Sequence, residues 1–314
     1  MNNSNMQEIN LSLVIPCFNE EEAIPFFYEN AIESFANESL IIEFIFVDDG
    51  SKDNTLDALK QLNSRDDRVH YLSFSRNFGK ESAILAGLKA SEGEYVAILD
   101  VDGQDPPSLI PKMLEAVASG EYDCAGTRRV TRAGEPPIRS FFAKRFYATM
   151  KKITDIEIVD GARDFRLMNR KYLNAFVELT ERNRFSKGMF PWIGFKVKWF
   201  EYENIERVAG STKWSFWKLF MYSLDGIFAF STKPLIIASV MGVLLFFASI
   251  VFIVFIVVRR LFWGDPVDGW ASTVCIILFC SGIQLFSVGI LGQYISKIYT
   301  ETKQRPQYII MDSQ

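Results

Sequence analysis

Short apolar runs alternate with amphipathic stretches through the first two thirds of the chain, from Leu11 to about Tyr202. Apolar runs of this length, bounded by polar residues, predict strands, and the stretches between them predict helices. Such alternation is typical of an α/β sheet with mostly parallel strands, flanked by helices. We expect strands at residues 11–17, 41–47, 69–74, 95–99 and 123–126, and helices at 21–35, 55–62, 81–90 and 109–118.

Two long uncharged segments follow in the last quarter of the chain. No charged residue occurs from Pro234 to Val258 or from Gly269 to Ser296. Each segment exceeds the roughly 20 residues that a helix needs to cross a bilayer. Helices buried in a soluble core rarely stay uncharged on all sides for so long. The pattern therefore predicts a hairpin of two transmembrane helices, at about 234–258 and 270–296.

Basic residues near the ends of these segments predict the orientation of the hairpin. Six lie outside the two segments and two in the loop between them: Lys213, Lys218, Lys233, Lys297, Lys303 and Arg305 against Arg259 and Arg260. Because short loops rich in Lys and Arg stay in the cytoplasm, both termini are expected there. Residues 1–10 show no signal-peptide pattern. We expect a multi-pass protein of the inner (plasma) membrane whose polar domain is cytoplasmic.

Two further segments combine aromatic with basic residues, the pattern of a helix that lies on an anionic membrane surface. They are Ser140–Ile153 and Ser215–Ser231. Packing in a protein core is the alternative for each. The expected division is therefore a polar domain at 1–210, a juxtamembrane interfacial segment at 211–232, the hairpin at 233–298 and a cytoplasmic tail at 299–314.

Composition agrees with a polar domain joined to a membrane hairpin. The 314 residues are 49% hydrophobic and 23% charged, and the mean hydropathy is +0.08. An aromatic content of 14% excludes a disordered chain. A net charge of −4 argues against a nucleic-acid partner, which calls for a basic domain. The four cysteines show neither a disulfide framework nor zinc-site spacing.

Polar residues follow three of the predicted strands. Asn19 and Glu20 follow the first, Asp48 and Asp49 the second, and an Asp-rich loop at 100–105 the fourth. Ligands of open α/β sheets bind beyond the carboxyl ends of the strands. One Asp in such a place is usually a helix cap, but crowded carboxylates repel one another unless a cation is bound. Oxygen ligands favour Mg²⁺ or Mn²⁺ over zinc, so we expect one of these two ions.

Three motifs carry a family resemblance. They read Val-Ile-Pro-Cys-Phe-Asn-Glu at 14–20, Val-Asp-Asp-Gly-Ser-Lys-Asp-Asn-Thr at 47–55 and Asp-Val-Asp-Gly-Gln-Asp-Pro-Pro at 100–107. Together with the hairpin, they make the chain resemble glycosyltransferase family 2, whose fold is GT-A. Within that family the chain is similar to the polyprenyl-phosphate glycosyltransferases, of the bactoprenol glucosyltransferase and dolichyl-phosphate mannose synthase types. The resemblance covers essentially the whole chain.

The resemblance implies roles for particular residues. Those matching nucleoside contacts are Pro16, Phe18, Glu20, Val47 and Asp49. Those matching contacts to the diphosphate and its metal are Asp100, Val101, Asp102 and Gln104, with Asp100, Asp102 and Gln104 as metal ligands. The basic residues matching contacts to the diphosphate or the acceptor phosphate are Arg128, Lys187, Arg207 and Lys213, with Arg128 and Arg139 on the acceptor side. The chain departs from the family at Gly103, where an apolar residue is commoner.

The acceptor determines what the remaining carboxylates would do. A lipid phosphate is already ionised at pH 7, so no general base is required. Asp160 and Asp164 are therefore expected to position the nucleophile or the sugar hydroxyls, and a general-base role for either is an alternative. A structural ion pair of Asp164 with Arg163 or Arg166 is a further alternative. The expected catalytic set is Asp102, Arg128, Asp160, Asp164, Arg207 and Lys213.

The resemblance implies inverting, metal-dependent transfer of a hexose from a UDP-sugar to polyprenyl (undecaprenyl) phosphate. The product would be a lipid-linked sugar donor for cell-envelope glycosylation. UDP-glucose is expected first and UDP-N-acetylglucosamine second. The alternatives are a mannose synthase that uses GDP-mannose, a processive polysaccharide synthase and a non-catalytic membrane subunit. The expected partners are the nucleotide sugar, the lipid and the bilayer. Association of the chain into a homo-oligomer is left open.

Overall fold

The computed structural model describes residues 10–36, 40–129, 154, 159, 161–202, 216–263 and 269–314. The chain divides into two compact units. One consists of Met1–Ser223 together with Arg305–Gln314, and the other is Leu224–Gln304. Four residues of the expected site, Arg139, Asp160, Arg207 and Lys213, lie outside the described residues, as does the expected interfacial segment Ser140–Ile153.

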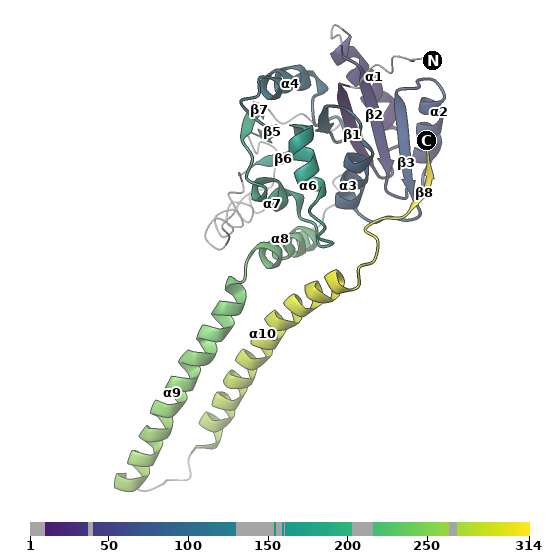
Figure 1. Ribbon diagram of the computed structural model, residues 1–314. Coiled ribbons are helices and arrows are strands. Elements are labelled where there is room, and N and C mark those ends of the chain that lie inside the picture. The colour runs from purple at the N-terminus through teal and green to yellow at the C-terminus, as the bar shows by residue number, and fades with distance from the viewer. Residues whose placement is uncertain are drawn as a thin grey trace. The chain divides into compact units, whose positions relative to one another are not determined.

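A mixed eight-stranded sheet forms the centre of the first unit (Figure 1). Its strands, in the spatial order β7-β5-β6-β4-β1-β2-β3-β8, are β1 (Leu11–Cys17), β2 (Ile42–Asp48), β3 (Val69–Phe74), β4 (Tyr95–Ile98), β5 (Cys124–Arg129), β6 (Ala162–Asn169), β7 (Val197–Tyr202) and β8 (Ile310–Ser313). The four strands β4, β1, β2 and β3 pair in parallel. By contrast, β6 runs antiparallel to both β4 and β5, and β8 runs antiparallel to β3.

Helices connect the parallel strands and supply the core. They are α1 (Ala23–Phe35), α2 (Thr55–Asn63), α3 (Lys80–Ala90) and α4 (Ile110–Ala118), the last preceded by the short 3₁₀ helix η1 (Pro107–Leu109). Alternate residues of β1 pack with α1 and α4 on one face, while Ile45 and Val47 of β2 pack with α3 on the other. This two-sided burial explains why the parallel strands read as continuous apolar runs. The predicted α/β fold is confirmed, with strand and helix ends close to those expected.

The second half of the first unit adds elements beyond those predicted. They are α6 (Arg170–Val177), α7 (Ser186–Trp192) and the strands β6 and β7. A side-chain cap starts α6, because Asn169 Oδ1 accepts a hydrogen bond from the Tyr172 amide at 2.8 Å. The ring of Phe176 on α6 stacks on Phe190 of α7 with centroids 4.3 Å apart. These contacts hold α7 near the end of β6.

The C-terminal residues, expected as a tail, join this sheet. Strand β8 pairs with the outer edge of β3, with Leu72 opposite Ser313. The Tyr308 ring stacks on Phe74 at 5.0 Å, and the Gln307 amide donates to the carbonyl of Glu181 at 2.8 Å. The segment that follows the hairpin is therefore part of the folded polar unit and covers its sheet edge.

The second unit contains two long apolar helices, α9 (Lys233–Trp263) and α10 (Trp270–Thr302). Stretches of each, Lys233–Arg259 and Ile276–Thr302, are long and apolar enough to cross a membrane, and neither is buried within the protein. They overlap the two spans expected from the sequence. A further helix, α8 (Phe216–Phe230), precedes them, and its Phe228 packs edge-on against Tyr294 of α10 at 5.3 Å. Asp225 of α8 also pairs with Lys297 of α10.

Candidate active site

The loops that follow β1 and β2 are bound to each other. The Asn19 amide donates to Ser51 Oγ at 2.9 Å, and its side-chain oxygen accepts from the Lys52 amide at 2.9 Å. The Glu20 amide donates to Thr55 Oγ1 at 2.9 Å. Phe18 and Glu20 thus lie beside the Asp48–Ser51 turn, as expected for two loops that follow neighbouring parallel strands. Pro16, within β1, lies opposite Val47 of β2.

Two residues of the expected site have side chains in the core. Val47 is fully buried and packs with Phe74 and Ala83. Val101 is also buried and belongs to the core on the other face of the sheet. A contact from either residue to a ligand would have to come from the backbone.

Asp49 binds the start of helix α3. Its carboxylate accepts hydrogen bonds from the amides of Phe78 and Gly79 at 2.6 and 2.9 Å. The residue is only 3% exposed, and burial raises the pKa of its carboxyl group to about 6, although the two backbone hydrogen bonds oppose that shift. Asp49 therefore orders the first turn of α3, a structural role that its place in a nucleoside motif did not suggest.

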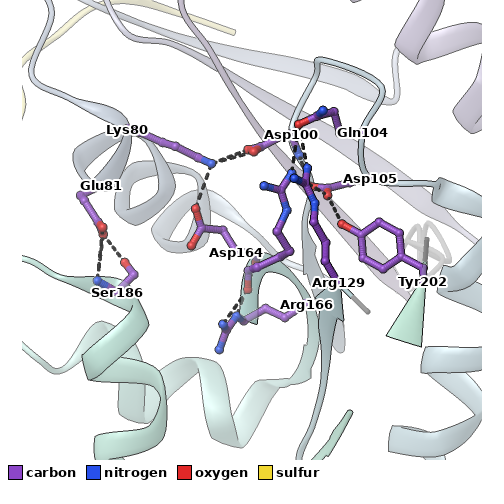
Figure 2. Close-up of polar contacts among 11 residues, drawn as sticks. Lys80, Glu81, Asp100, Gln104, Asp105, Arg129, Asp164, Arg166, Ser186 and Tyr202 are labelled. Atoms are coloured by element: carbon purple, nitrogen blue, oxygen red, sulfur yellow. Dashed lines mark hydrogen bonds and ion pairs between the residues drawn. The ribbon is translucent and has the colours of Figure 1, made fainter. Parts of the chain in front are cut away.

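Lys80, the first residue of α3, bridges two of the expected site carboxylates (Figure 2). Its ammonium nitrogen lies 2.6 Å from Asp100 Oδ1 and 2.9 Å from Asp164 Oδ2. Ile98 of β4 lies opposite Arg166 of β6, and continuing that register by two residues brings Asp100 opposite Asp164. A lysine between them offsets the repulsion of two facing carboxylates.

The sequence reasoning missed Lys80. A signal was present, because a lysine in the first turn of a helix opposes the helix dipole and calls for a compensating anion. In the described part of the chain Asp164 forms its ion pair with Lys80, while the Arg166 guanidinium donates to the backbone carbonyl of Asp164. Arg166 also stacks on the Phe190 ring, 3.3 Å from its centroid.

The charge state of Asp164 follows from its neighbours. Burial raises the pKa of this carboxyl group, but the nearby ammonium groups of Lys80 and Lys187 outweigh that effect and hold the pKa well below its usual range. Lys187 lies on α7, whose first residue, Ser186, donates from its backbone amide and its hydroxyl to Glu81. Lys80 and Glu81, adjacent in α3, thus bind β6 and α7 respectively.

Asp105 forms a buried cluster behind the Asp100 loop. It is 1% exposed, accepts from the Tyr202 hydroxyl at 2.8 Å and lies 3.6 Å from the Arg163 guanidinium. Its other oxygen accepts from the Asp100 amide at 3.1 Å. Burial and the Asp100 charge raise the pKa of Asp105 to about 6. Asp105 therefore fixes the backbone that presents Asp100, a role found only in the folded structure.

The Asp102–Gln104 turn is closed locally. The Gln104 amide donates to Asp102 Oδ1 at 3.1 Å, and Gly103 between them adopts φ 75°. The left-handed conformation accounts for a glycine at this position. The Gln104 side-chain oxygen accepts from Arg129 at 2.8 Å and from Arg163 at 3.4 Å. The amide oxygen expected at the metal is thus directed at two guanidinium groups.

The carboxylates of this loop fit a divalent cation that is held partly by the protein and partly by a bound phosphate compound. Over the described ranges, His, Cys, Asp and Glu form no group of three that could hold a metal ion alone. Mg²⁺ in phosphate-transfer sites is usually held by one or two carboxylates together with substrate phosphates and water. Asp100 and Asp102 match that arrangement, since both are carboxylates of one loop at the carboxyl end of β4.

Three basic residues contact this loop, since Arg129 and Arg163 donate to Gln104 and Lys80 pairs with Asp100. Arg128, at the end of β5, pairs with Glu201 of β7. The Nε atoms of Arg128 and Arg129 are buried, and neither has a hydrogen-bond partner among the described residues. Such donors, together with Arg163 and Lys80, suit a polyanion that approaches the carboxylates through a cation. The described part of the site can therefore bind a phosphate-bearing ligand.

Comparisons with known proteins agree with this chemistry. A model of the family described as "Glycosyl transferase family 2" matches residues 12–176. A bactoprenol glucosyl transferase of Shigella phage SfX is 42% identical over 96% of this chain and 98% of its own length. A relative from Synechocystis sp., 38% identical over 97% of this chain and 95% of its own length, is named only as an uncharacterized glycosyltransferase.

Likeness to solved structures is more distant. Glucosyl-3-phosphoglycerate synthase from Mycobacterium tuberculosis, in complex with Mn²⁺, UDP and phosphoglyceric acid, is 17% identical. The match covers 69% of this chain and 75% of that chain, with a TM-score of 0.49.

Proposed function

The chain belongs to glycosyl transferase family 2, and from that membership we propose that it transfers a hexose from a UDP-sugar to a polyprenyl phosphate. The proposed donor is UDP-glucose, with UDP-N-acetylglucosamine second, and the proposed acceptor is undecaprenyl phosphate. The lipid-linked sugar then serves as a donor for glycosylation of the cell envelope. The observation that carries the proposal is the similarity to a bactoprenol glucosyl transferase over 96% of this chain, the apolar hairpin included.

We assign the donor to the carboxyl ends of β1, β2 and β4. Phe18, Glu20 and the Asp48–Ser51 turn are the proposed surroundings of the nucleoside, where β1 and β2 end side by side. The diphosphate then reaches the Asp100–Gln104 loop. Arg129 supports an anion at this place, because it contacts Gln104 and its buried Nε atom has no partner in the described part of the chain.

A divalent cation, Mg²⁺ or Mn²⁺, belongs to this proposal. When bound, it stabilises the negative charge that develops on the leaving diphosphate. Asp100 and Asp102 would hold it, and the donor phosphates would complete its ligands. Gln104 is a weaker candidate, because its side-chain oxygen accepts hydrogen bonds from Arg129 and Arg163.

The proposed reaction is a single inverting displacement. An ionised oxygen of the lipid phosphate attacks the anomeric carbon from the face opposite the diphosphate, and the bonding electrons leave with UDP. No proton has to be removed from the acceptor, so Asp164 needs only to position the reacting groups. Its ion pair with Lys80 and its low pKa agree with a carboxylate that stays ionised. The further positions proposed for this step are Asp160, Lys187, Arg207 and Lys213, with Arg128 and Arg139 at the acceptor phosphate.

Two helices suited to crossing a membrane support a membrane-borne acceptor. We propose that Lys233–Arg259 and Ile276–Thr302 span the bilayer, with both termini in the cytoplasm. The folding of Arg305–Gln314 with the polar unit supports an even number of spans, because one folded unit cannot be divided by a bilayer. The cytoplasmic assignment rests on the distribution of Lys and Arg.

The experiment that tests the proposal identifies the product. Purified protein is incubated with Mn²⁺, undecaprenyl phosphate and, separately, UDP-glucose, UDP-N-acetylglucosamine and GDP-mannose, and the lipid extract is analysed by mass spectrometry. We expect undecaprenyl phosphate to gain one hexose from UDP-glucose. A product formed only from GDP-mannose would replace the proposed donor, and a lipid bearing several sugars would indicate a processive synthase.

A further inference from the structure

We propose that Lys80 is an internal counter-ion that holds Asp100 until the donor diphosphate arrives, and thereby weakens binding of a divalent cation to the nucleotide-free protein. This inference rests on the proposed function, because it takes Asp100 as a metal ligand. It assigns a positioning role to a residue outside the motifs of the family resemblance.

The contacts of Lys80 place it in competition with a metal ion. Its ammonium lies 2.6 and 2.8 Å from the two oxygens of Asp100, so it contacts both atoms that a divalent cation would use. It also lies 2.9 Å from Asp164, which approaches from β6. One lysine therefore neutralises part of the charge of two carboxylates that face each other across neighbouring strands.

Hydrogen bonds on both sides of Lys80 hold the first turn of α3 in place and thereby fix the position of the Lys80 backbone. Asp49, at the end of β2, accepts from the amides of Phe78 and Gly79, immediately before the lysine. Glu81, immediately after it, accepts from the amide of Ser186 at 3.2 Å (Figure 2). The backbone at Lys80 is thus anchored to the sheet and to α7, while its side chain remains 41% exposed. Only the flexible side chain has to move for the ammonium to leave Asp100.

A donor diphosphate would give the ammonium another partner. With the diphosphate present, Lys80 can keep Asp164 and turn from Asp100 to a phosphate oxygen, which frees Asp100 for the cation. Without it, a divalent cation at Asp100 must displace the lysine or accept a like charge close by. Cation binding and donor binding are then coupled, and the coupling is the same whichever ligand binds first.

The test measures Mn²⁺ binding to the full-length protein in detergent, from the electron paramagnetic resonance signal of free Mn²⁺, with and without UDP. The variants are Lys80→Met and Lys80→Gln, which remove the charge, and Lys80→Arg, which keeps it. The Lys80→Gln variant keeps hydrogen-bond donors near both carboxylates, so it can replace Lys80→Met in the test if the latter does not fold. The matched control is Lys89→Met, at the exposed far end of the same helix.

We expect the two neutral variants to bind Mn²⁺ without UDP at least about fivefold more tightly than the wild type, because a competing cation is gone. The Mn²⁺ affinities of Lys80→Arg and Lys89→Met without UDP should stay within about twofold of the wild-type affinity. The neutral variants should also show a smaller gain in Mn²⁺ affinity on adding UDP. A lysine that only stabilised the fold would not produce tighter Mn²⁺ binding when removed.

Unchanged or weaker Mn²⁺ binding by both neutral variants, with the wild type binding normally, would overturn this inference and leave the proposed function intact. Absence of Mn²⁺ binding by the wild type, even with UDP, would overturn both the inference and the metal site of the proposed function.

Discussion

The buried carboxyl group of Asp49 gives the protein a specific dependence on pH. Its pKa rises from 3.8 in the unfolded chain to about 6 in the fold, so the folded state holds the proton more tightly. Stability from this group is therefore greatest below pH 4 and decreases as the pH rises to 6. The shift of roughly two units corresponds to about 3 kcal/mol.

Asp49→Asn should remove this contribution. We expect the melting temperature of the wild type, relative to that of the variant, to decrease between pH 4 and 6 and to stay level from pH 7 to 8. Thermal unfolding of both proteins in the same series of buffers measures this difference in melting temperature. A difference independent of pH would show that Asp49 keeps its ordinary pKa.

Gly50, in the turn after β2, is required by both conformation and space. Its φ is 65°, and a Cβ atom there would lie 2.3 Å from the carbonyl carbon of Arg76. Gly120 also has a positive φ, 78°, but nothing within 4 Å of its Cβ position. Gly120→Ala should cost about 1 kcal/mol of strain, and Gly50→Ala at least about 2 kcal/mol more. Denaturant unfolding gives the free energy of unfolding of each variant. Equal decreases for Gly50→Ala and Gly120→Ala would contradict the close approach to Arg76.

Single residues also mark the limit of what the sequence could predict about the site. Asp100 and Asp102 were found because they are adjacent in one motif at a strand end. Lys80 and Tyr202 were missed because their carboxylate partners are distant in sequence, and for the same reason Arg163 was considered only beside Asp164 and not beside Asp105. Only strand pairing, with Ile98 opposite Arg166, brings β6 and its Asp164 to that motif.

Strand β8 is the element that attaches the end of the chain to the sheet. The Tyr308 ring before it stacks on Phe74 and packs beside Phe78 in the core that covers α3. Tyr308→Ala should lower the free energy of unfolding by about 2 kcal/mol, because it removes an aromatic pair and leaves a cavity. Asp312→Asn is the matched control on the same segment, since it removes the charge of an exposed ion pair with Lys60 and leaves the Tyr308 ring in place. Equal melting temperatures for the two variants would mean that β8 contributes little to stability.

The elements differ in how readily their patterns predict them. The strands β1 to β4 are buried on both faces, and their continuous apolar runs predict them well. In β6, three charged side chains interrupt the run, and they are stable there because Lys80, Asp105 and Phe190 contact them. Strand β8 is short and separated from its partner β3 by the whole hairpin, so no local pattern reveals the pairing.

Across the whole molecule, the hairpin predicts a definite labelling pattern. In a background with Cys275 and Cys280 replaced by Ser, Asp265→Cys, between the spans, should react with an impermeant thiol reagent added to intact cells. Lys112→Cys, exposed on α4, should react only after the cells are opened. Labelling of both positions in intact cells, or of Lys112→Cys alone, would contradict the orientation deduced from the basic residues.

The central claim is that one chain unites a nucleotide-sugar site at the carboxyl ends of its strands with a membrane-borne acceptor. The most direct test follows radiolabel from UDP-glucose into the organic phase in the presence of undecaprenyl phosphate and Mn²⁺, for the wild type and for Asp102→Asn. We predict lipid-bound label from the wild type, with one UDP released per glucose transferred, and a rate at least about 100-fold lower for the variant. Equal transfer by both proteins would contradict the assigned site, and no lipid-bound label from the wild type would contradict the claim itself.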